Sequence, residues 1–184
     1  MPKPETTTQG PDYFMFDAVS TVLNQAGKPE QQLATAYLAH YPDDDRTELK
    51  DAHLTLHQED GSLWSIKANK GTLYNATEQI FLSGQVVIER PQPTPATAEG
   101  APQETTPQEN GQGATVPANI LQGGLKIETD QLRIDAARQF AETNDPVHII
   151  SQELKVNALG MKANLQTKTV ELLAKVRGTY APQH

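Results

Sequence analysis

The stretch LWSIKANKGTLYNATEQIFLSGQVVIER, which runs from Leu63 to Arg90, decides the fold class because apolar and polar residues alternate along it. In an extended strand, Trp64, Ile66 and Ala68 would lie on one face and the polar residues between them on the other. A period of two is typical of a half-buried β-sheet. Turn-forming residues at Lys70-Gly71 and from Asn75 to Glu78 predict where these strands end.

The same alternation returns along most of the chain, for example from Leu125 to Glu128 and from Val147 to Ile149. Further turn residues occur at Asn144-Asp145-Pro146 and Leu159-Gly160. Short strands separated by turns about every eight to twelve residues predict an all-β protein. The segment from Gln31 to His40 contains good helix formers, but it also alternates and its neighbours are strands, so we interpret it as a strand.

An internal repeat supports stacked β-hairpins. Shifting the chain by 61 positions places Trp64 on Leu125 and Ile66 on Ile127, and apolar positions continue to meet apolar positions as far as Ile88 on Ile149. A hairpin with one apolar face cannot bury that face alone, whereas stacked hairpins form a continuous apolar interior. The expected product is a solenoid-like sheet with two open edges, which can serve to dock partners.

The length of 184 residues is compatible with a single domain. We expect a disordered tail at 1–10, one β-domain at 11–180 and a short tail at 181–184. Within the domain, the segment from Pro91 to Asn119 is rich in Pro, Thr, Gln and Gly, which predicts a disordered insertion in one sheet.

Composition excludes several classes of function. The formal net charge of -8 argues against nucleic acid as a partner, and the absence of cysteine excludes disulfides and thiolate sites. His53 and His57 are four residues apart, but on a strand they share an outward face, and Asp43 to Asp45 forms an acidic turn without the ligand spacing of a calcium loop. No catalytic motif occurs. We therefore expect no enzyme activity, no cofactor and no metal site.

Membrane signals are also absent from this chain. No window has the roughly 18 to 20 apolar residues that span a bilayer, and the start, MPKPETTTQGPDYF, is not a signal peptide. On its own this chain is expected to be soluble.

From Pro11 to Tyr180 the sequence resembles the LptC family of the lipopolysaccharide export machine. The residues that carry the resemblance form four short blocks: Trp64, Ile66 and Ala68; Leu82, Gly84, Val86 and Ile88; Thr129 and Leu132; and Gly160, Met161, Ala163, Leu172, Leu173, Val176, Arg177, Gly178 and Tyr180.

This resemblance implies a single-domain, twisted open β-jellyroll, with two facing antiparallel sheets in a V shape, whose apolar interior binds the acyl chains of lipopolysaccharide. Burying an acyl chain of twelve methylenes gains about 10 kcal/mol relative to water. The alternation assigns these residues to the inner face of the groove: Trp64, Ile66, Ala68, Leu73, Val86, Ile88, Leu125, Ile127, Ile134, Val147, Ile149, Val156, Met161 and Ala163.

The resemblance also implies docking of related jellyrolls edge to edge, with lipopolysaccharide passing from the inner-membrane transporter, LptF and LptG with the ATPase LptB, to the periplasmic bridge protein LptA. At the C-terminal edge the expected docking residues are Val170, Leu172, Leu173, Val176, Arg177 and Tyr180. At the N-terminal edge they are Tyr13, Phe14, Phe16, Val19 and Val22. We expect backbone bends at Gly84, Gly160 and Gly178, or at the last two a close approach between strands.

Family members carry an N-terminal transmembrane helix, which this chain lacks, so we expect a native protein anchored at the periplasmic face of the inner membrane. Three alternatives stay open at this point. The chain could be a soluble bridge protein like LptA, the same edges could pair in a homodimer, or a closed core could make it a structural adaptor that binds partners without lipid.

Overall fold

The computed structural model describes residues 10–57, 61–91, 114–116, 124–135, 137–138, 140–152, 154–164, 167 and 169–180. In these residues the chain forms ten strands and one short 3-10 turn, η1 (Asn75–Thr77). The strands are β1 (Tyr13–Leu23), β2 (Pro29–Tyr41), β3 (Arg46–His57), β4 (Leu63–Tyr74), β5 (Gln79–Arg90), β6 (Ala114–Val116), β7 (Leu125–Asp135), β8 (Phe140–Ser151), β9 (Leu154–Asn164) and β10 (Thr169–Tyr180).

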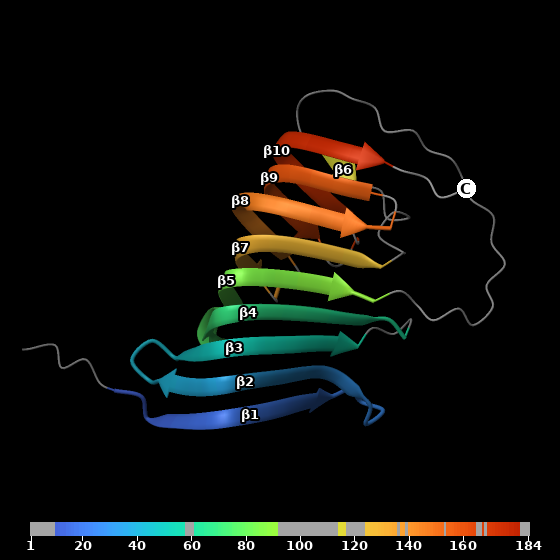
Figure 1. The fold of residues 1–184 in the computed structure, drawn as a ribbon. Coiled ribbons are helices and arrows are strands. Elements are labelled where there is room, and N and C mark those ends of the chain that lie inside the picture. Colours follow the sequence, from blue (N-terminus) through green and yellow to red (C-terminus); the bar gives the residue numbers. More distant parts are fainter. Residues whose placement is uncertain are drawn as a thin grey trace, which may run out of the picture.

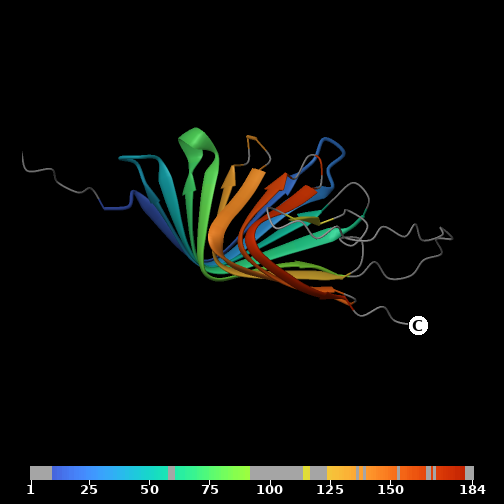
Figure 2. The ribbon, with the colours of Figure 1, turned by 90° about the horizontal axis from the view of Figure 1, so that it is seen from above.

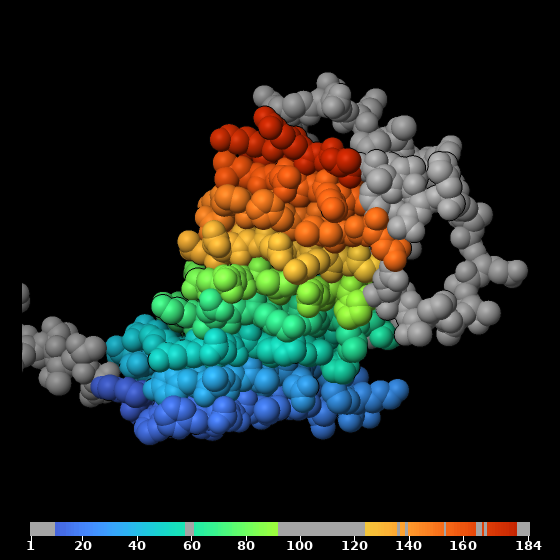
Figure 3. Space-filling view, viewed as in Figure 1, coloured from blue at the N-terminus to red at the C-terminus, as the bar shows by residue number. Residues whose placement is uncertain are grey.

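All ten strands belong to one sheet, in the order β1-β2-β3-β4-β5-β7-β8-β9-β10-β6. Each neighbouring pair is antiparallel. Apart from β6, the strands lie side by side in chain order, and they form successive bands across the molecular surface (Figures 1 and 3). The all-β prediction is confirmed, and the segment from Gln31 to His40 is a strand as predicted.

Each long strand bends near its middle, so the single sheet is creased into a V with two wings (Figure 2). From β4 to β10, every strand pair shifts its register at the same level, for example between Ser83 and Val86 and between Thr143 and Pro146. Such bulges bend a strand and increase its twist. The two facing sheets predicted from the sequence are therefore the two wings of one continuous sheet.

We call the side of the crease that contains Ile134 wing A and the side that contains Ile149 wing B. In β5, for example, Gln79 to Ser83 belongs to wing A and Val86 to Arg90 to wing B.

Backbone conformations that are rare for side-chain-bearing residues gather at the crease. Positive φ angles occur at Asp17 in β1, Asp51 in β3, Gln85 in β5 and Lys175 in β10. Gly84 and Gly160, where the sequence predicts bends, also have positive φ, 77° and 79°. Since glycine has no Cβ, it adopts this conformation at the lowest cost.

For Gly178 the sequence predicts a sharp bend or a close approach between strands. This glycine has no left-handed φ, and a Cβ built there would lie 3.3 Å from Val156 Cγ2. A close approach to β9, rather than a bend, favours glycine at this position.

Buried threonines bind backbone groups that the crease frees from regular pairing. The Thr35 hydroxyl lies 2.8 Å from the carbonyl oxygen of Tyr37 and 2.7 Å from that of Lys50. On the opposite part of the sheet, the backbone N–H of Asp145 donates to Thr143 Oγ1 at 3.1 Å. These bonds offset the cost of burying unpaired backbone groups.

Three of the predicted turns lie inside strands. Lys70-Gly71 lies within β4, Asn144-Asp145-Pro146 within β8 and Leu159-Gly160 within β9. The turn-forming residues at these places mark the crease, where the chain bulges but continues into the other wing. The predicted turn at Asn75 to Glu78 does connect two strands, β4 and β5.

Part of the predicted insertion, Pro91 to Asn119, is a strand, because β6 pairs with β10. Of the rest of that segment the structure describes only Pro91, and residues 1–9 and 181–184 also lie outside the described residues. In the described part of the chain, no helix is long and apolar enough to cross a membrane.

Replacing Gly160 with alanine tests the crease. A Cβ built at Gly160 would lie 2.9 Å from Leu173 Cδ1, in addition to the strain of φ 79°, so we expect the free energy of unfolding to fall by about 2–3 kcal/mol. Gly27→Ala is the matched control, because Gly27 has φ 75° but nothing within 4 Å of a built Cβ; it should cost about 1 kcal/mol. Urea unfolding measures both, and equal losses would contradict the close packing at the crease.

Candidate functional site: the inner face and the two edges of the sheet

The inner face of the V is lined by rows of apolar residues that cross the sheet. Residues paired directly in an antiparallel sheet lie on the same face. Pairing therefore joins one row across wing B: Leu54, Ile66, Ile88, Ile127, Ile149 and Val156. A second row crosses wing A: Leu73, Ile80, Ile134, Ala141, Ala163 and Val170. The predicted alternation thus selects one continuous apolar face.

Twelve of the fourteen predicted groove residues belong to one buried cluster that spans both wings; Trp64 packs against it and only Leu73 lies outside it, partly buried. Val147 is 0% exposed, and Met161 and Ile149 are 1% exposed. From β4 to β10 the two wings therefore pack against each other, so this part of the inner face is a closed core. The sequence prediction missed the cluster members Leu82, Leu132, Ala141 and Ala158, although the same alternation includes them.

The inner face opens toward the N-terminal end of the sheet. The buried cluster stops at β4, with Leu54 and Leu56 of β3 packed against it. On β1, the inner-face side chains of Tyr13 and Met15 are 48% and 46% exposed. The apolar face thus continues beyond the closed core as an uncovered surface.

The outer face is polar and carries ion pairs between and along strands. Lys67 Nζ lies 3.7 Å from Glu89 Oε2, and Arg133 NH1 lies 3.5 Å from Glu142 Oε1. Lys126 Nζ lies 2.7 Å from Glu128 Oε1, and this contact raises the pKa of Lys126 and lowers that of Glu128. The charges are thus concentrated on the face that alternates away from the core.

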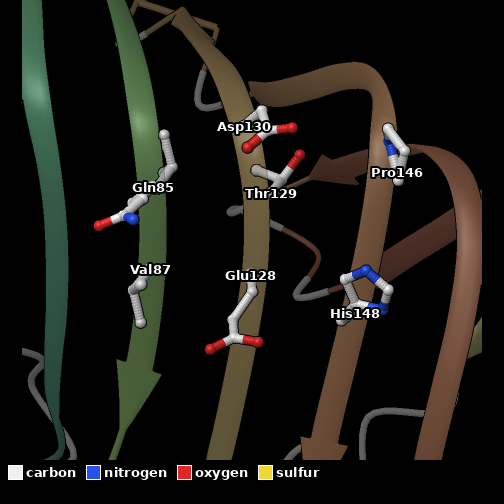
Figure 4. Close-up of a pocket in the computed structure, with 8 residues that line it drawn as sticks. Gln85, Val87, Glu128, Thr129, Asp130, Pro146 and His148 are labelled. Carbon is white, nitrogen blue, oxygen red and sulfur yellow. The ribbon is translucent and has the colours of Figure 1, made fainter.

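Two shallow cavities lie on the outer face in the described part of the chain. One, of about 340 Å³, lies outside the crease and includes Gln85, Glu128, Asp130 and His148 (Figure 4). The other, of about 430 Å³, is lined by Thr72, Tyr74, Thr77, Gln79 and Phe81. In the described residues, no group of three or more His, Cys, Asp or Glu is placed to hold a metal ion.

The N-terminal edge strand is strongly apolar. Of the ten large apolar side chains that are well exposed in the described residues, seven lie on β1: Tyr13, Phe14, Met15, Phe16, Val19, Val22 and Leu23. On the outer face, the ring of Phe16 lies 5.3 Å from that of Tyr37 and 5.8 Å from that of Phe14. All five predicted docking residues of this edge are therefore exposed on a strand that has one neighbour, β2.

The C-terminal edge is different in character. Val170 and Leu172, predicted to dock a partner, are buried members of the core cluster, and Leu173 and Val176 are partly buried. The exposed side chains on β10 include Glu171, Lys175, Arg177 and Thr179. On its outer side, Val170 to Leu172 pairs with β6, so β10 is not the outermost strand along that stretch.

A histidine bridge connects the start of β1 to the turn between β2 and β3: His40 of β2 contacts Asp12, directly before β1, and Asp45, in that turn. His40 Nδ1 lies 2.7 Å from Asp12 Oδ1, and His40 Nε2 lies 3.0 Å from Asp45 Oδ1. The ring of Tyr13 stacks on the imidazole at 4.9 Å. The hydrogen bonds to Asp45 and Asp12 raise the pKa of His40, whereas the Asn75 amide and then His40 lower the pKa of Asp45.

These features define a class of protein: an open β-jellyroll whose single sheet folds an apolar face inward and leaves two edges for pairing. Comparison with known proteins identifies the family. The sequence profile of the family described as "Lipopolysaccharide-assembly, LptC-related" matches residues 1–181, so the chain belongs to this family. Its role accordingly lies in lipopolysaccharide assembly rather than in enzyme catalysis.

Individual relatives agree with this assignment. The "Lipopolysaccharide export system protein LptC" of Escherichia coli strain K12 is 25% identical over 175 residues, which are 95% of this chain and 77% of the relative. The protein of the same name from Shigella flexneri has the same identity and coverage.

The histidine bridge predicts that the N-terminal edge loosens as the pH rises. Because the pKa of His40 is raised in the folded chain, its contribution is complete below the unfolded value of 6.5 and is lost as the pH rises through the folded value. Hydrogen exchange of the Tyr13 to Phe16 amides, corrected for intrinsic rates, should therefore accelerate in that range. His40→Gln should remove the pH dependence, and the matched variant His53→Gln should keep it. A pH-independent wild-type profile would contradict the bridge.

Proposed function

We propose that this chain binds the acyl chains of lipopolysaccharide between its wings and passes the lipid from the inner-membrane transporter to a periplasmic bridge protein. The observation that carries the proposal is the apolar inner face, which continues across the sheet and is uncovered at its N-terminal end. Moving an acyl chain of twelve methylenes from an apolar environment into water costs about 10 kcal/mol of free energy. An apolar trough avoids this loss while the sugar headgroup remains in solvent.

Lipid binding requires the wings to separate. The most buried inner residues, such as Val147 and Met161, are inaccessible when the wings are packed. Acyl chains would replace the contacts between the wings with contacts of the same apolar kind, so the exchange costs little hydrophobic free energy. Such an opening would begin at β1, where the inner-face side chains of Tyr13 and Met15 are exposed.

The distribution of charge suits a lipid that has to move on. In the described part of β4 to β10 the ion pairs lie on the outer face, so the apolar rows there offer non-directional contacts that do not fix the lipid at one position. Movement in one direction would depend on ATP hydrolysis by LptB.

Edge pairing connects the chain to its neighbours. The apolar β1 edge would receive a strand of LptF or LptG, and β10 would receive a strand of LptA, each through backbone hydrogen bonds. The chain would then work at the periplasmic face of the inner membrane, behind a membrane anchor. Self-pairing of the same edges in a homodimer, and a soluble bridge role like that of LptA, use the same geometry.

A second function is favoured by the closed core. Twelve predicted groove residues belong to the buried cluster, which is also what a structural adaptor without a lipid site would show. The two functions differ in whether lipid reaches the inner face.

Photo-crosslinking distinguishes them. A photoreactive residue replaces the partly buried inner residues Ile80 and Leu154, and in matched variants it replaces their outer-face neighbours Phe81 and Lys155. These positions lie at the margin of the core, so the variants should fold. With lipopolysaccharide and the full transporter, we expect crosslinks from the inner pair at least several-fold above those from the outer pair. Equal yields, or none from a folded and partner-bound protein, would favour the adaptor.

A further inference from the structure

β6 covers part of the edge that the proposed function assigns to LptA. The pairs Val170–Val116, Glu171–Thr115 and Leu172–Ala114 form an antiparallel ladder on one side of β10. On the other side, the same three residues pair with β9. The backbone of β10 is thus engaged on both sides along Val170 to Leu172.

The rest of the edge is open. In the part of the chain that the structure describes, no strand pairs with the outer side of β10 beyond Leu172. The crease in β10 falls between Ala174 and Arg177. The edge therefore has two parts. On wing A, β6 pairs with Val170 to Leu172, whereas on wing B no described residue pairs with the outer side of Arg177 to Tyr180.

The chain leaves the direct path between β5 and β7 in order for β6 to pair with β10. Arg90 and Leu125 are paired neighbours in β5 and β7, so a short connection would join them. Instead the chain runs to the outer side of β10, where β6 lies four strand spacings from β7, which is about 19 Å, and then returns to β7. From Val116 to Leu125 there are nine Cα-to-Cα steps, with a reach of about 32 Å at most. A displaced β6 thus stays within reach of the same edge.

We propose that β6 is a built-in competitor for the C-terminal edge, which an incoming partner strand must displace to pair along the whole of β10. The N–H and C=O groups that point outward from an edge strand can pair with only one neighbouring strand at a time, so β6 and a partner strand cannot both pair with Val170 to Leu172. With only three residue pairs, β6 is short enough to be displaced. The return linker keeps it at a high effective concentration. The partner pairs first along Arg177 to Tyr180 and then replaces β6.

The pairing of β6 also protects the free chain against association with other copies. Unpaired strand edges promote such association, and β6 shortens the unpaired length of β10 until a specific partner binds. The competition raises the apparent Kd of the edge for its partner, because the apparent Kd equals the intrinsic Kd divided by the fraction of molecules in which β6 is displaced. The inference rests on the proposed function in one respect, which is that the incoming strand belongs to LptA.

The test uses the full chain with Ala114→Pro and Thr115→Pro together. Proline has no backbone N–H, and successive residues of a strand point their N–H groups to opposite sides, so one of the two substitutions removes an N–H that faces β10. Gln103→Pro with Thr105→Pro is the matched control in the same segment but outside β6. Neither pair changes the net charge. Two quantities are measured: hydrogen exchange of the Val170 to Leu172 amides in the free chain, and the Kd for purified LptA.

We expect the β6 variant to exchange faster at Val170 to Leu172 and to bind LptA at least about threefold more tightly, with the control unchanged in both. Unchanged exchange would overturn the inference, because β6 would not protect the edge. Faster exchange with an unchanged Kd would also overturn it, because the cover would not compete. If none of the three proteins binds LptA, C-terminal docking and the competition both fail, whereas the lipid crosslinks from Ile80 and Leu154 test the lipid site independently.

Discussion

The interruption of pairing at one level of every long strand is the constraint on which the rest of this structure depends. A flat sheet of these strands would leave its apolar face in water. Bulges between Ser83 and Val86, Thr143 and Pro146, and Ala174 and Arg177 bend the strands at a common line, so one sheet supplies both walls of its own core. Glycine at positions 84 and 160 and the buried threonines stabilise that line, since they accept positive φ or bind the freed backbone groups.

A core made this way has different properties from a core between two separate layers. The wings are joined along the crease and are free at their outer ends, so they can separate without unpairing the sheet. Since the sheet does not close into a barrel, two edges remain, and they are unlike. β1 is exposed and aromatic on its outer face, whereas β10 is more polar and partly covered by β6.

Much of this could be predicted from the sequence, because alternation is a local signal. The alternation alone assigns Ile66, Ile88, Ile127 and Ile149 to the inner face, and in the structure they form one row. The same signal predicts turns at the crease, because the phase of the alternation changes there. In β4 the inner residues are Ile66 and Ala68 before the crease and Gly71 and Leu73 after it. Other features depend on contacts distant in sequence. β6 pairs with β10 through its backbone, and the polar segment that contains β6 has no alternation of apolar and polar residues that would predict a strand. The packing of wing A on wing B depends on the angle between them at the crease, which a local pattern does not contain.

The most direct test of the central claim is the distance between the wings with and without lipid. Because the chain has no cysteine, spin labels can be placed on Lys155→Cys and Lys162→Cys, on the outer face of β9 on either side of Gly160. Lys70→Cys with Lys162→Cys, both on wing A, is the control. Pulsed electron paramagnetic resonance should show the Lys155–Lys162 distance lengthening when lipopolysaccharide is loaded, while the control distance stays constant. An unchanged distance in a chain that carries lipid would contradict the account, because the acyl chains would then lie outside the V.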